Sequence, residues 1–416
     1  MGTLLTDQAI APRGLPPFVY LFISATGGVA SGFVIVTLGY LLSTKGVPVA
    51  QIAAMISLTL LPSTLRFLVG PVIDLALTPL NWVAICTVAI FASMACLAFT
   101  PLSVKAMPMV DILAFVLGCT SNAKGCAVAA AMARTTDNAQ RGAVAGWSNA
   151  GMLGGTSLGG GAGVWLAVHA GGAPVAGMVL AVAGAVLILP TFWMRMPPMV
   201  HPAGLGAKVR EIAGVLWDLV RERRGILVAL VCVIPCAIGA ATNLLPAVAG
   251  DWRASANTVA LISSLSGFTI MGGCVLGGYL CDLYPRRVVY AWSGLAFAAT
   301  EAAMALAPHT PAWFSAMVLV NSFALGLGWA GIGAVIFDCL GARAAATVLT
   351  VLGSLCNIPL VAMTLVVGGV QTAHGSNAML MVEAVAAVIS LAGYAALAWL
   401  WKPGAVGVGN LIVAEG

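Results

Sequence analysis

The chain consists of long apolar runs separated by short breaks. Each run reaches about 20 residues, the length that a helix needs to cross the hydrocarbon core of a bilayer. The apolar positions are continuous rather than alternating, which favours helices over the strands of a membrane barrel. The pattern predicts about twelve membrane-spanning helices, over residues 17–43, 50–75, 81–102, 107–134, 142–169, 174–194, 225–249, 257–283, 287–308, 312–338, 344–370 and 376–401.

One long polar segment, residues 195–224, interrupts this series. Its second half, 207–220, has apolar residues at helical spacing, so we expect an amphipathic helix that lies on the membrane surface. The segment divides the chain into an N-terminal six-helix bundle over residues 1–194 and a C-terminal six-helix bundle over residues 225–416.

Composition agrees with a membrane protein, because 61% of the residues are hydrophobic and 7% are charged. Soluble domains have about a quarter charged residues. The first apolar run lacks the short apolar region and cleavage site of a signal peptide, so it is interpreted as a true span. The ten cysteines are scattered and show no metal-binding spacing. The histidines fall at loops or span ends, so we expect neither a metal site nor a cofactor; they are His169, His201, His309 and His374.

Lysine and arginine residues are distributed unevenly between the loops on the two sides of the predicted bundle. Thirteen fall on the side of the termini and of the central segment, against Lys45, Lys105 and Arg253 on the other side. Basic residues collect in cytoplasmic loops. We therefore expect both termini and the central segment to lie in the cytoplasm, with the protein in a bacterial inner membrane. The thirteen are Arg13, Arg134, Arg141, Arg195, Lys208, Arg210, Arg221, Arg223, Arg224, Arg286, Arg287, Arg343 and Lys402.

The two halves repeat each other in pattern. The second and eighth spans both end in small residues followed by an acid, Asp74 or Asp282. The junction after the fourth span has an acid shortly before Arg141, and the junction after the tenth has one shortly before Arg343. These acidic and basic residues lie where the cytoplasmic ends of the helices meet, so we predict that Asp74, Asp282, Arg141 and Arg343 act in gating.

Three stretches of the N-terminal half resemble a known family. "LRFLVGPVIDL" at 65–75 is similar to a K/R-F-L-x-x-P-x-x-D pattern, and "TTDNAQRGAVAGWSNAGMLGG" at 135–155 is similar to a T-D…R-G pattern. The exit of the first span, "LSTKGVPVAQIAAM" at 42–55, is the third stretch with this resemblance. They resemble the AmpG-like branch of the major facilitator superfamily, which includes muropeptide permeases, acetyl-CoA transporters and RhtX/FptX-type siderophore permeases. The resemblance implies an all-α polytopic fold of two pseudo-symmetric six-helix halves, related as parallel repeats. The branch typically has an acid in the fourth span, whereas this chain has Asn122 and Lys124 there.

Two basic residues fall within the predicted spans, and this makes them the first candidates for solute binding. Lys124 and Arg66 belong to spans four and two, which flank the same half of such a fold. A charge at the centre of a membrane helix costs about 2.5–3.5 kcal/mol on insertion scales, so it faces a partner or a watery cavity. If both cations reach a central cavity, they favour an anionic or zwitterionic solute. The alternative is that each pairs with a carboxylate or a backbone carbonyl for structure.

Other polar residues at membrane depth add candidates. Glu301 and Glu383 are the deepest acids, and burial favours the neutral form of a carboxyl group, so we predict that they couple transport to protons. Structural hydrogen bonding is the alternative. Polar amides and aromatic rings bind solutes but also join helices or anchor them at the interface. The candidates for solute binding among them are Asn122, Asn243, Asn357, Tyr40, Trp147 and Trp329.

The predicted function is secondary active transport of an organic solute. The glycine-rich stretch Gly151–Gly163 lacks the Lys-Ser/Thr ending of a phosphate loop, so it is interpreted as a smooth face for close helix packing. No nucleotide-binding motif is present, and we expect protons to drive import by a monomer. A siderophore or ferric siderophore is the leading solute, and a muropeptide or another anionic amphiphile is the alternative. A membrane receptor without transport is the alternative class, and an intramembrane enzyme is not expected.

Overall fold

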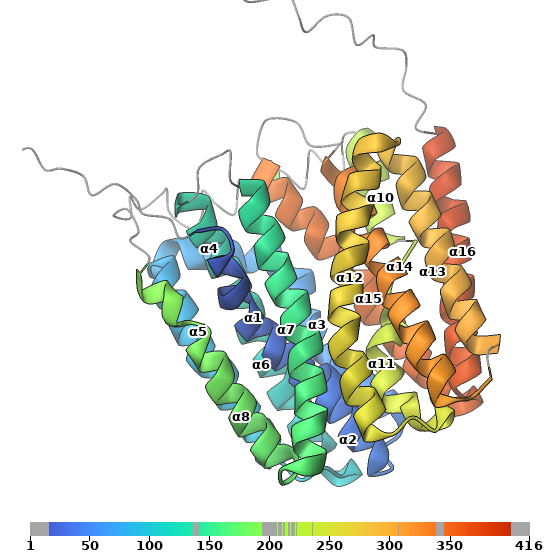
Figure 1. Cartoon of the computed structure of the whole chain (residues 1–416). Helices are drawn as coiled ribbons and strands as arrows, with labels where there is room; N and C mark the ends of the chain where they lie inside the picture. The colour runs from blue at the N-terminus through green and yellow to red at the C-terminus, as the bar shows by residue number, and fades with distance from the viewer. Residues whose placement is uncertain are drawn as a thin grey trace, which may run out of the picture.

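The computed structural model of the chain is a bundle of long helices that run side by side (Figure 1). It describes residues 16–135, 141–193, 206, 210, 213–214, 217, 221, 223–234, 236–306, 308–337 and 345–400. Within these residues, ten helical segments are long and apolar enough to cross a membrane. The predicted all-α polytopic architecture is confirmed. Most of the segment 195–224 lies outside the described residues, so the predicted amphipathic helix and the limits of the two halves stay predictions.

The first six spans form the N-terminal half, on the left of Figure 1. The first two spans are each divided into shorter helical pieces. The elements in chain order are α1 (Val19–Gly32), the π-helical η1 (Phe33–Leu38), α2 (Gly39–Thr44), α3 (Val49–Leu60), the 3-10 helix η2 (Leu61–Leu65), α4 (Arg66–Ala76), α5 (Pro79–Phe99), η3 (Val104–Ala106), α6 (Met107–Thr135), α7 (Arg141–His169), α8 (Gly172–Val186) and η5 (Leu189–Trp193).

The C-terminal half follows, on the right of Figure 1. Its elements are α10 (Arg223–Val233), α11 (Ala240–Val248), η6 (Ala249–Trp252), α12 (Ala256–Leu283), α13 (Arg286–Leu306), α14 (Pro311–Phe337), α15 (Ala345–His374) and α16 (Ser376–Leu400). α1 begins and α16 ends at the same end of the bundle, which we call the terminal end; the other end is the far end (Figure 1). The segment 225–249, predicted as one span, is divided into α10 and α11 by a break.

Small residues allow the helices to approach closely, as lipid-embedded bundles require. Gly151 and Gly155 of α7 lie against the backbone of α1, where an added Cβ would overlap Leu21 and Ala25. The glycine-rich stretch therefore packs as predicted from its sequence.

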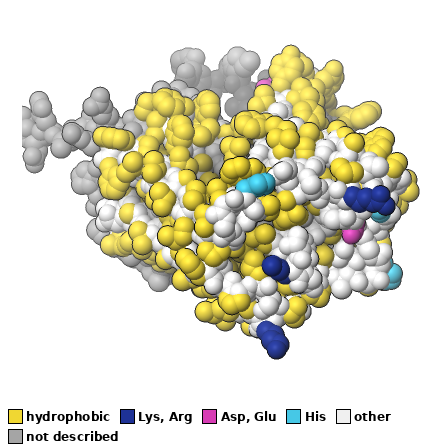
Figure 2. All heavy atoms as spheres, turned by 60° about the horizontal axis from the view of Figure 1, so that its bottom comes forward, with side chains coloured by type: hydrophobic (Ala, Val, Ile, Leu, Met, Phe, Trp, Pro, Cys, Tyr) yellow, Lys and Arg dark blue, Asp and Glu magenta, His cyan; other side chains and the backbone are white. Residues whose placement is uncertain are grey.

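The two halves meet along α7–α12 and α3–α15. At the far end they share one hydrophobic core, in which Phe33 and Ile52 of the N-terminal half belong to the same cluster as Leu244 and Trp252 of the C-terminal half. Toward the terminal end each half has its own core, one around Tyr20 and the other grouping Val228 with Ile332 and Val335, all of them buried. The core that the halves share therefore lies at the far end, while α15 also contacts η2 and α4 of the N-terminal half. Figure 2 shows the far end turned toward the viewer, where the basic side chains are few and lie apart from one another.

Candidate functional site

The segment predicted as the seventh span is interrupted near its middle. α10 ends at Val233 and α11 begins at Ala240, and the described residues between them are not helical. Gly239 has a φ of 77°, in the left-handed region that glycine enters without steric cost, and α11 starts from it. The first amide groups of a helix have no partners within that helix, and lipid offers none. The start of α11 therefore needs acceptors from elsewhere in the protein.

Glu383 of α16 supplies these acceptors. The N–H groups of Ala240 and Ala241 donate to its two carboxyl oxygens, at 2.7 Å and 2.5 Å. The side chain is 0% exposed. Helix N-termini attract negative charge, because their free N–H groups point toward the ligand and the helix dipole is positive there. Glu383 thus acts as the cap of α11, although it belongs to the last span of the chain.

Asn321 of α14 joins the start of α11 to a second buried acid. Its amide oxygen accepts a hydrogen bond from Thr242 Oγ1 at 2.9 Å. Its amide nitrogen donates to Glu301 Oε1 at 2.8 Å and to Thr300 Oγ1 at 3.2 Å. Asn321 is 0% exposed, so all these bonds lie in a dry interior where each is strengthened. Three helices, α11, α13 and α14, are therefore tied together through one amide.

Glu301 of α13 is the group whose bonding is incomplete. It is fully buried, and its Oε2 atom has no hydrogen-bond partner among the described residues. Through Asn321 it is linked to Thr242, the residue after the two amides that Glu383 caps, so the two buried acids belong to one hydrogen-bonded network. Two carboxylates in one site cannot both ionise without a large penalty. A proton on this oxygen would remove the negative charge, and a cation in contact with it would compensate for that charge.

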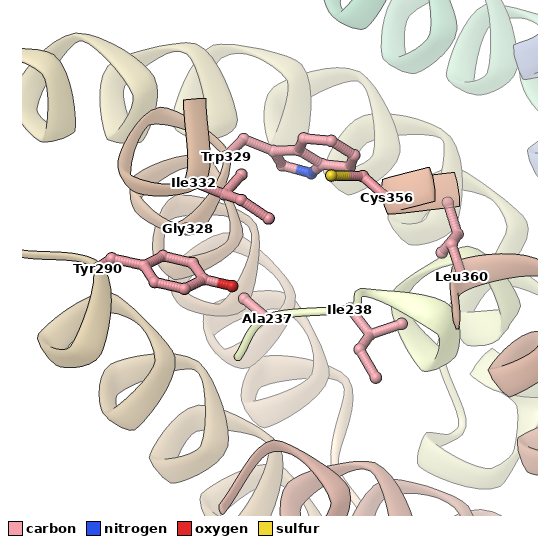
Figure 3. A pocket seen from close by; sticks show the side chains of 8 residues that line it. All are labelled: Ala237, Ile238, Tyr290, Gly328, Trp329, Ile332, Cys356 and Leu360. Atoms are coloured by element: carbon pink, nitrogen blue, oxygen red, sulfur yellow. The ribbon is translucent and has the colours of Figure 1, made fainter. Parts of the chain in front are cut away.

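A pocket opens beside the break in the seventh span (Figure 3). Ala237 and Ile238 of the break form one wall, and the ring of Trp329 lies across the pocket near Cys356 (Figure 3). The Tyr290 hydroxyl accepts a hydrogen bond from the N–H of Cys236 at 2.9 Å, which fixes the chain within the break. This pocket brings one predicted solute-binding residue, Trp329, next to the irregular backbone.

Lys124 lies inside the N-terminal half. It is 2% exposed, and its ammonium donates to the carbonyl oxygen of Ile23 in α1 at 2.8 Å. The same carbonyl also accepts from Thr26 Oγ1 at 2.8 Å. α5 packs against both α1 and α6 in the same half. The ammonium is therefore enclosed by α1, α5 and α6, and a backbone carbonyl is its one hydrogen-bond partner among the described residues.

Arg66 and Asn122 gather around the 3-10 segment of the second span. The Asn122 amide, which is buried, donates to the carbonyl oxygen of Pro62 at 2.9 Å. The Arg66 guanidinium is exposed and lies over Gly125, where an added Cβ would come within 2.6 Å of Nη2. The structure thus brings Arg66, Asn122 and Lys124 to neighbouring turns of α6, with the guanidinium as the accessible charge.

Replacing Gly125 with alanine is expected to displace Arg66 without loss of stability. The new Cβ would meet the far end of a flexible side chain, while alanine improves the helix by about 1 kcal/mol over glycine. We expect an unchanged or raised melting temperature, together with weaker uptake of an anionic solute. Gly70→Ala is the matched control, because a Cβ there meets nothing within 4 Å. Equal uptake in the two variants would contradict a role of Arg66 in solute binding.

The remaining predicted binding residues are dispersed. Asn357 donates only within its own helix, to the Gly353 carbonyl at 2.8 Å, and Asn243 is half-buried on α11. Tyr40 packs against the core of the far end, whereas Trp147 is 43% exposed in the second turn of α7, near the terminal end. Tyr40 and Trp147 therefore lie toward opposite ends of the bundle, and one solute of ordinary size does not reach both.

The predicted gating residues are placed only in part. Asp282 is exposed at the last turn of α12, at the terminal end. The backbone of Asp74 lies near the end of α4 and that of Arg141 begins α7, but their side chains are outside the described part of the chain, as is the whole of Arg343. Gating by these four residues stays a prediction.

Sequence reasoning did not find the network around Asn321. The chain has five asparagines at membrane depth, and the ones near proline or glycine were favoured. The stretch from Val233 to Gly239 contains Pro235 and Gly239, which together signal a helix break, and Pro246 follows inside α11. Those residues were the available signal that the seventh span is interrupted and needs capping partners.

The chain matches a known protein family in sequence and is similar to solved structures in fold. The family model of the Major Facilitator Superfamily matches residues 20–359. No curated protein matches the sequence. The fold is similar to a variant of the nucleoside transporter NupG, with a TM-score of 0.71 and 14% identity over 91% of this chain and 98% of that one. It is also similar to a D-xylose-proton symporter, with a TM-score of 0.71 and 14% identity over 92% and 97% of the two chains.

A further solved structure, the partially occluded inward open conformation of the xylose transporter XylE from E. coli, has a TM-score of 0.69 and 13% identity over 93% of this chain and 99% of that one. At such identities the likeness concerns the fold. The family model covers most of the chain, so the protein belongs to the major facilitator superfamily.

Proposed function

We propose that the protein is a proton-driven importer of an organic solute that works by alternating access. The observation that carries this proposal is the packing of the two halves, which share one core at the far end and have separate cores toward the terminal end. A transporter that closes one end at a time needs this asymmetry. With the termini in the cytoplasm, as the basic residues indicate, this conformation is closed to the outside.

The proposed solute is anionic or zwitterionic. Arg66 supports this, because it is an exposed guanidinium on α4, which packs against α15 of the other half. Lys124 adds a second positive charge on the neighbouring helix α6, and its hydrogen bond to Ile23 uses one of the three N–H donors of the ammonium. Trp329 offers an aromatic face from the C-terminal half. We infer that the solute lies between these groups.

The motifs shared with the AmpG-like branch favour a ferric siderophore, and a muropeptide comes second. Because a nucleoside transporter and a xylose symporter have a similar fold, nucleosides and pentoses are included in the test below. We further propose a location in a bacterial inner membrane with both termini in the cytoplasm.

Uptake into proteoliposomes tests the proposal. The purified protein is reconstituted, and the panel contains ferric siderophores, muropeptides, nucleosides and pentoses, with and without an inward proton gradient. We expect one class to accumulate, with uptake that a protonophore abolishes. Protein-free liposomes and heat-inactivated protein are the controls. If no member of the panel shows gradient-stimulated uptake, the proposal fails, and saturable binding without flux would favour a receptor.

A further inference from the structure

We propose that Glu301, Glu383 and Asn321 form a one-proton site that controls the start of α11. In this assignment Glu301 carries the proton, Glu383 stays ionised as the cap of α11, and Asn321 is the positioning residue for both. The inference deepens the proposed function, because it says where a driving proton binds and which element it acts on. Only the role of this site in transport rests on the proposed function. The site itself is defined by the hydrogen bonds of its three residues.

The bonding of Glu383 assigns the charge to that residue. Both of its oxygens accept from backbone N–H groups, those of Ala240 and Ala241. A protonated carboxyl group would place a hydrogen where an oxygen now accepts, so one of the two amides would lose its partner. The start of α11 also contributes the positive end of its helix dipole. The ionised form is therefore the one that this geometry stabilises.

The bonding of Glu301 assigns the proton to that residue. Oε1 accepts from Asn321, and Oε2 is fully buried with no partner in the described structure. A second negative charge in the network that holds Glu383 would be poorly screened, because both acids are 0% exposed. Oε2 is the atom where a proton removes that charge without breaking any hydrogen bond. One proton for the pair follows from these contacts.

Asn321 connects the proton to the moving part of the fold. It touches Glu301 through its nitrogen and Thr242 of α11 through its oxygen. α11 packs against α2, α3 and η1 of the other half at the far end. When Glu301 loses its proton, the two acids repel each other, and relief requires Glu383 to release α11 or to take up a proton itself. The proton therefore favours the conformation in which the far end is closed.

The surroundings leave Glu383 as the charge that acts on Glu301. α11 and α14 contain no acidic, basic, histidine, cysteine or tyrosine residue within their bounds. On α13 and α16 the other such groups are Arg286, Arg287, Tyr290 and Tyr394, and these lie toward the terminal end, where the Tyr290 and Tyr394 rings pack together. The groups on the remaining neighbours are Arg223, Arg224 and Cys232 on α10; Tyr40 on α2; Asp251 on η6; Cys274, Tyr279, Cys281 and Asp282 on α12; and Cys356 and His374 on α15.

Infrared spectroscopy of the purified full-length protein without solute tests the assignment. We expect a protonated-carboxyl band in wild type that is missing from Glu301→Gln and present in Glu383→Gln. Asp111→Asn and Asp282→Asn are the matched controls and should keep the band. Asn321→Leu should keep the band but shift its frequency, because Oε1 loses its hydrogen bond, and a purely structural role would not do this. Carbon-13 labelling of glutamate in wild type must shift the same band, which tests the assignment even if a variant does not fold.

Hydrogen exchange of the α11 amides tests the coupling. Glu383→Gln should speed exchange at Ala240 and Ala241 by about tenfold, as expected for the loss of a buried hydrogen bond. In wild type, these amides should lose protection over the pH range in which the infrared band disappears, once the exchange rates are corrected for intrinsic exchange. In Glu301→Gln, their protection should not depend on pH. The inference is overturned if the band is unaffected by Glu301→Gln or by labelling, or if the protection of these amides in wild type does not depend on pH. It is also overturned if the band disappears when sodium ions are added. No solute enters these measurements, so a failed uptake assay leaves them unaffected.

Discussion

Replacing Gly368 with valine is expected to open the far end of the protein. Gly368 of α15 lies directly on Ala53 of α3, and a Cβ at this position would overlap the alanine side chain. Next to it, the N–H of Ala50 donates to Thr372 Oγ1 at 2.9 Å, so the two halves are tightly joined here. A branched side chain forces α15 away from α3. Overpacking of this kind costs about 1–3 kcal/mol in the conformation where the helices touch.

An energetic penalty in the conformation with a closed far end changes the population ratio of the closed and open conformations. About 1–3 kcal/mol corresponds to a roughly 5- to 150-fold change in the population ratio. Probes on Lys45 and Arg253, which are exposed at the far end in different halves, should report a longer distance in Gly368→Val. We expect uptake to fall by a similar factor, because the far end closes less often.

The adjacent glycine provides the control for this experiment. A Cβ at Gly369 meets nothing within 4 Å, although it lies in the same helix and one residue further on. Gly369→Val should leave both the distance and uptake near the wild-type values. If both valine variants lengthen the distance equally, the effect comes from the helix backbone, and the proposed closure at the α3–α15 contact is wrong.

The spans could be predicted because lipid imposes a requirement on each segment by itself. A helix that crosses a bilayer needs a continuous apolar run, and that property is visible without knowing its neighbours. The same local reading failed at the seventh span, where the break is stabilised by Glu383, a residue 143 positions later than Ala240. Apolar periodicity contains no information about which distant helix supplies a cap.

The candidate site shows the same limit. Glu301 and Glu383 could be selected because an acid within an apolar run is conspicuous, and both are fully buried. Asn321 was passed over for Asn357, whose amide bonds only to its own helix. What distinguishes Asn321 is that Thr242 and Glu301 lie on either side of it, and their arrangement depends on how α11, α13 and α14 pack. A residue's partners are a property of the assembled bundle.

Replacing Lys124 with methionine is expected to raise stability and to weaken uptake. The ammonium is 2% exposed and has a backbone carbonyl as its hydrogen-bond partner in the described structure, without an acid beside it. Replacing buried ionic groups by apolar residues of similar volume is often neutral or stabilising, by about 1–4 kcal/mol. Methionine is close to lysine in length and flexible enough to fill the same space. The melting temperature should therefore stay the same or increase.

The expected loss of uptake has an electrostatic cause. Two opposite unit charges about 7 Å apart attract by roughly 2 kcal/mol at an effective dielectric constant of about 20. If the solute anion lies within about this distance of Lys124, the lysine contributes at this level without touching it, and affinity should fall by more than tenfold in Lys124→Met. Lys105→Met, at an exposed position of the far end, should change neither property.

The two measurements separate the roles that a buried lysine can have. A higher melting temperature with lost uptake means that the protein tolerates an unfavourable charge because the solute needs it. A lower melting temperature means that the bond to Ile23 holds α1 and α6 together, and any loss of uptake is then secondary. A stable variant with full uptake would remove Lys124 from the solute site and leave Arg66 as the cation that selects the solute.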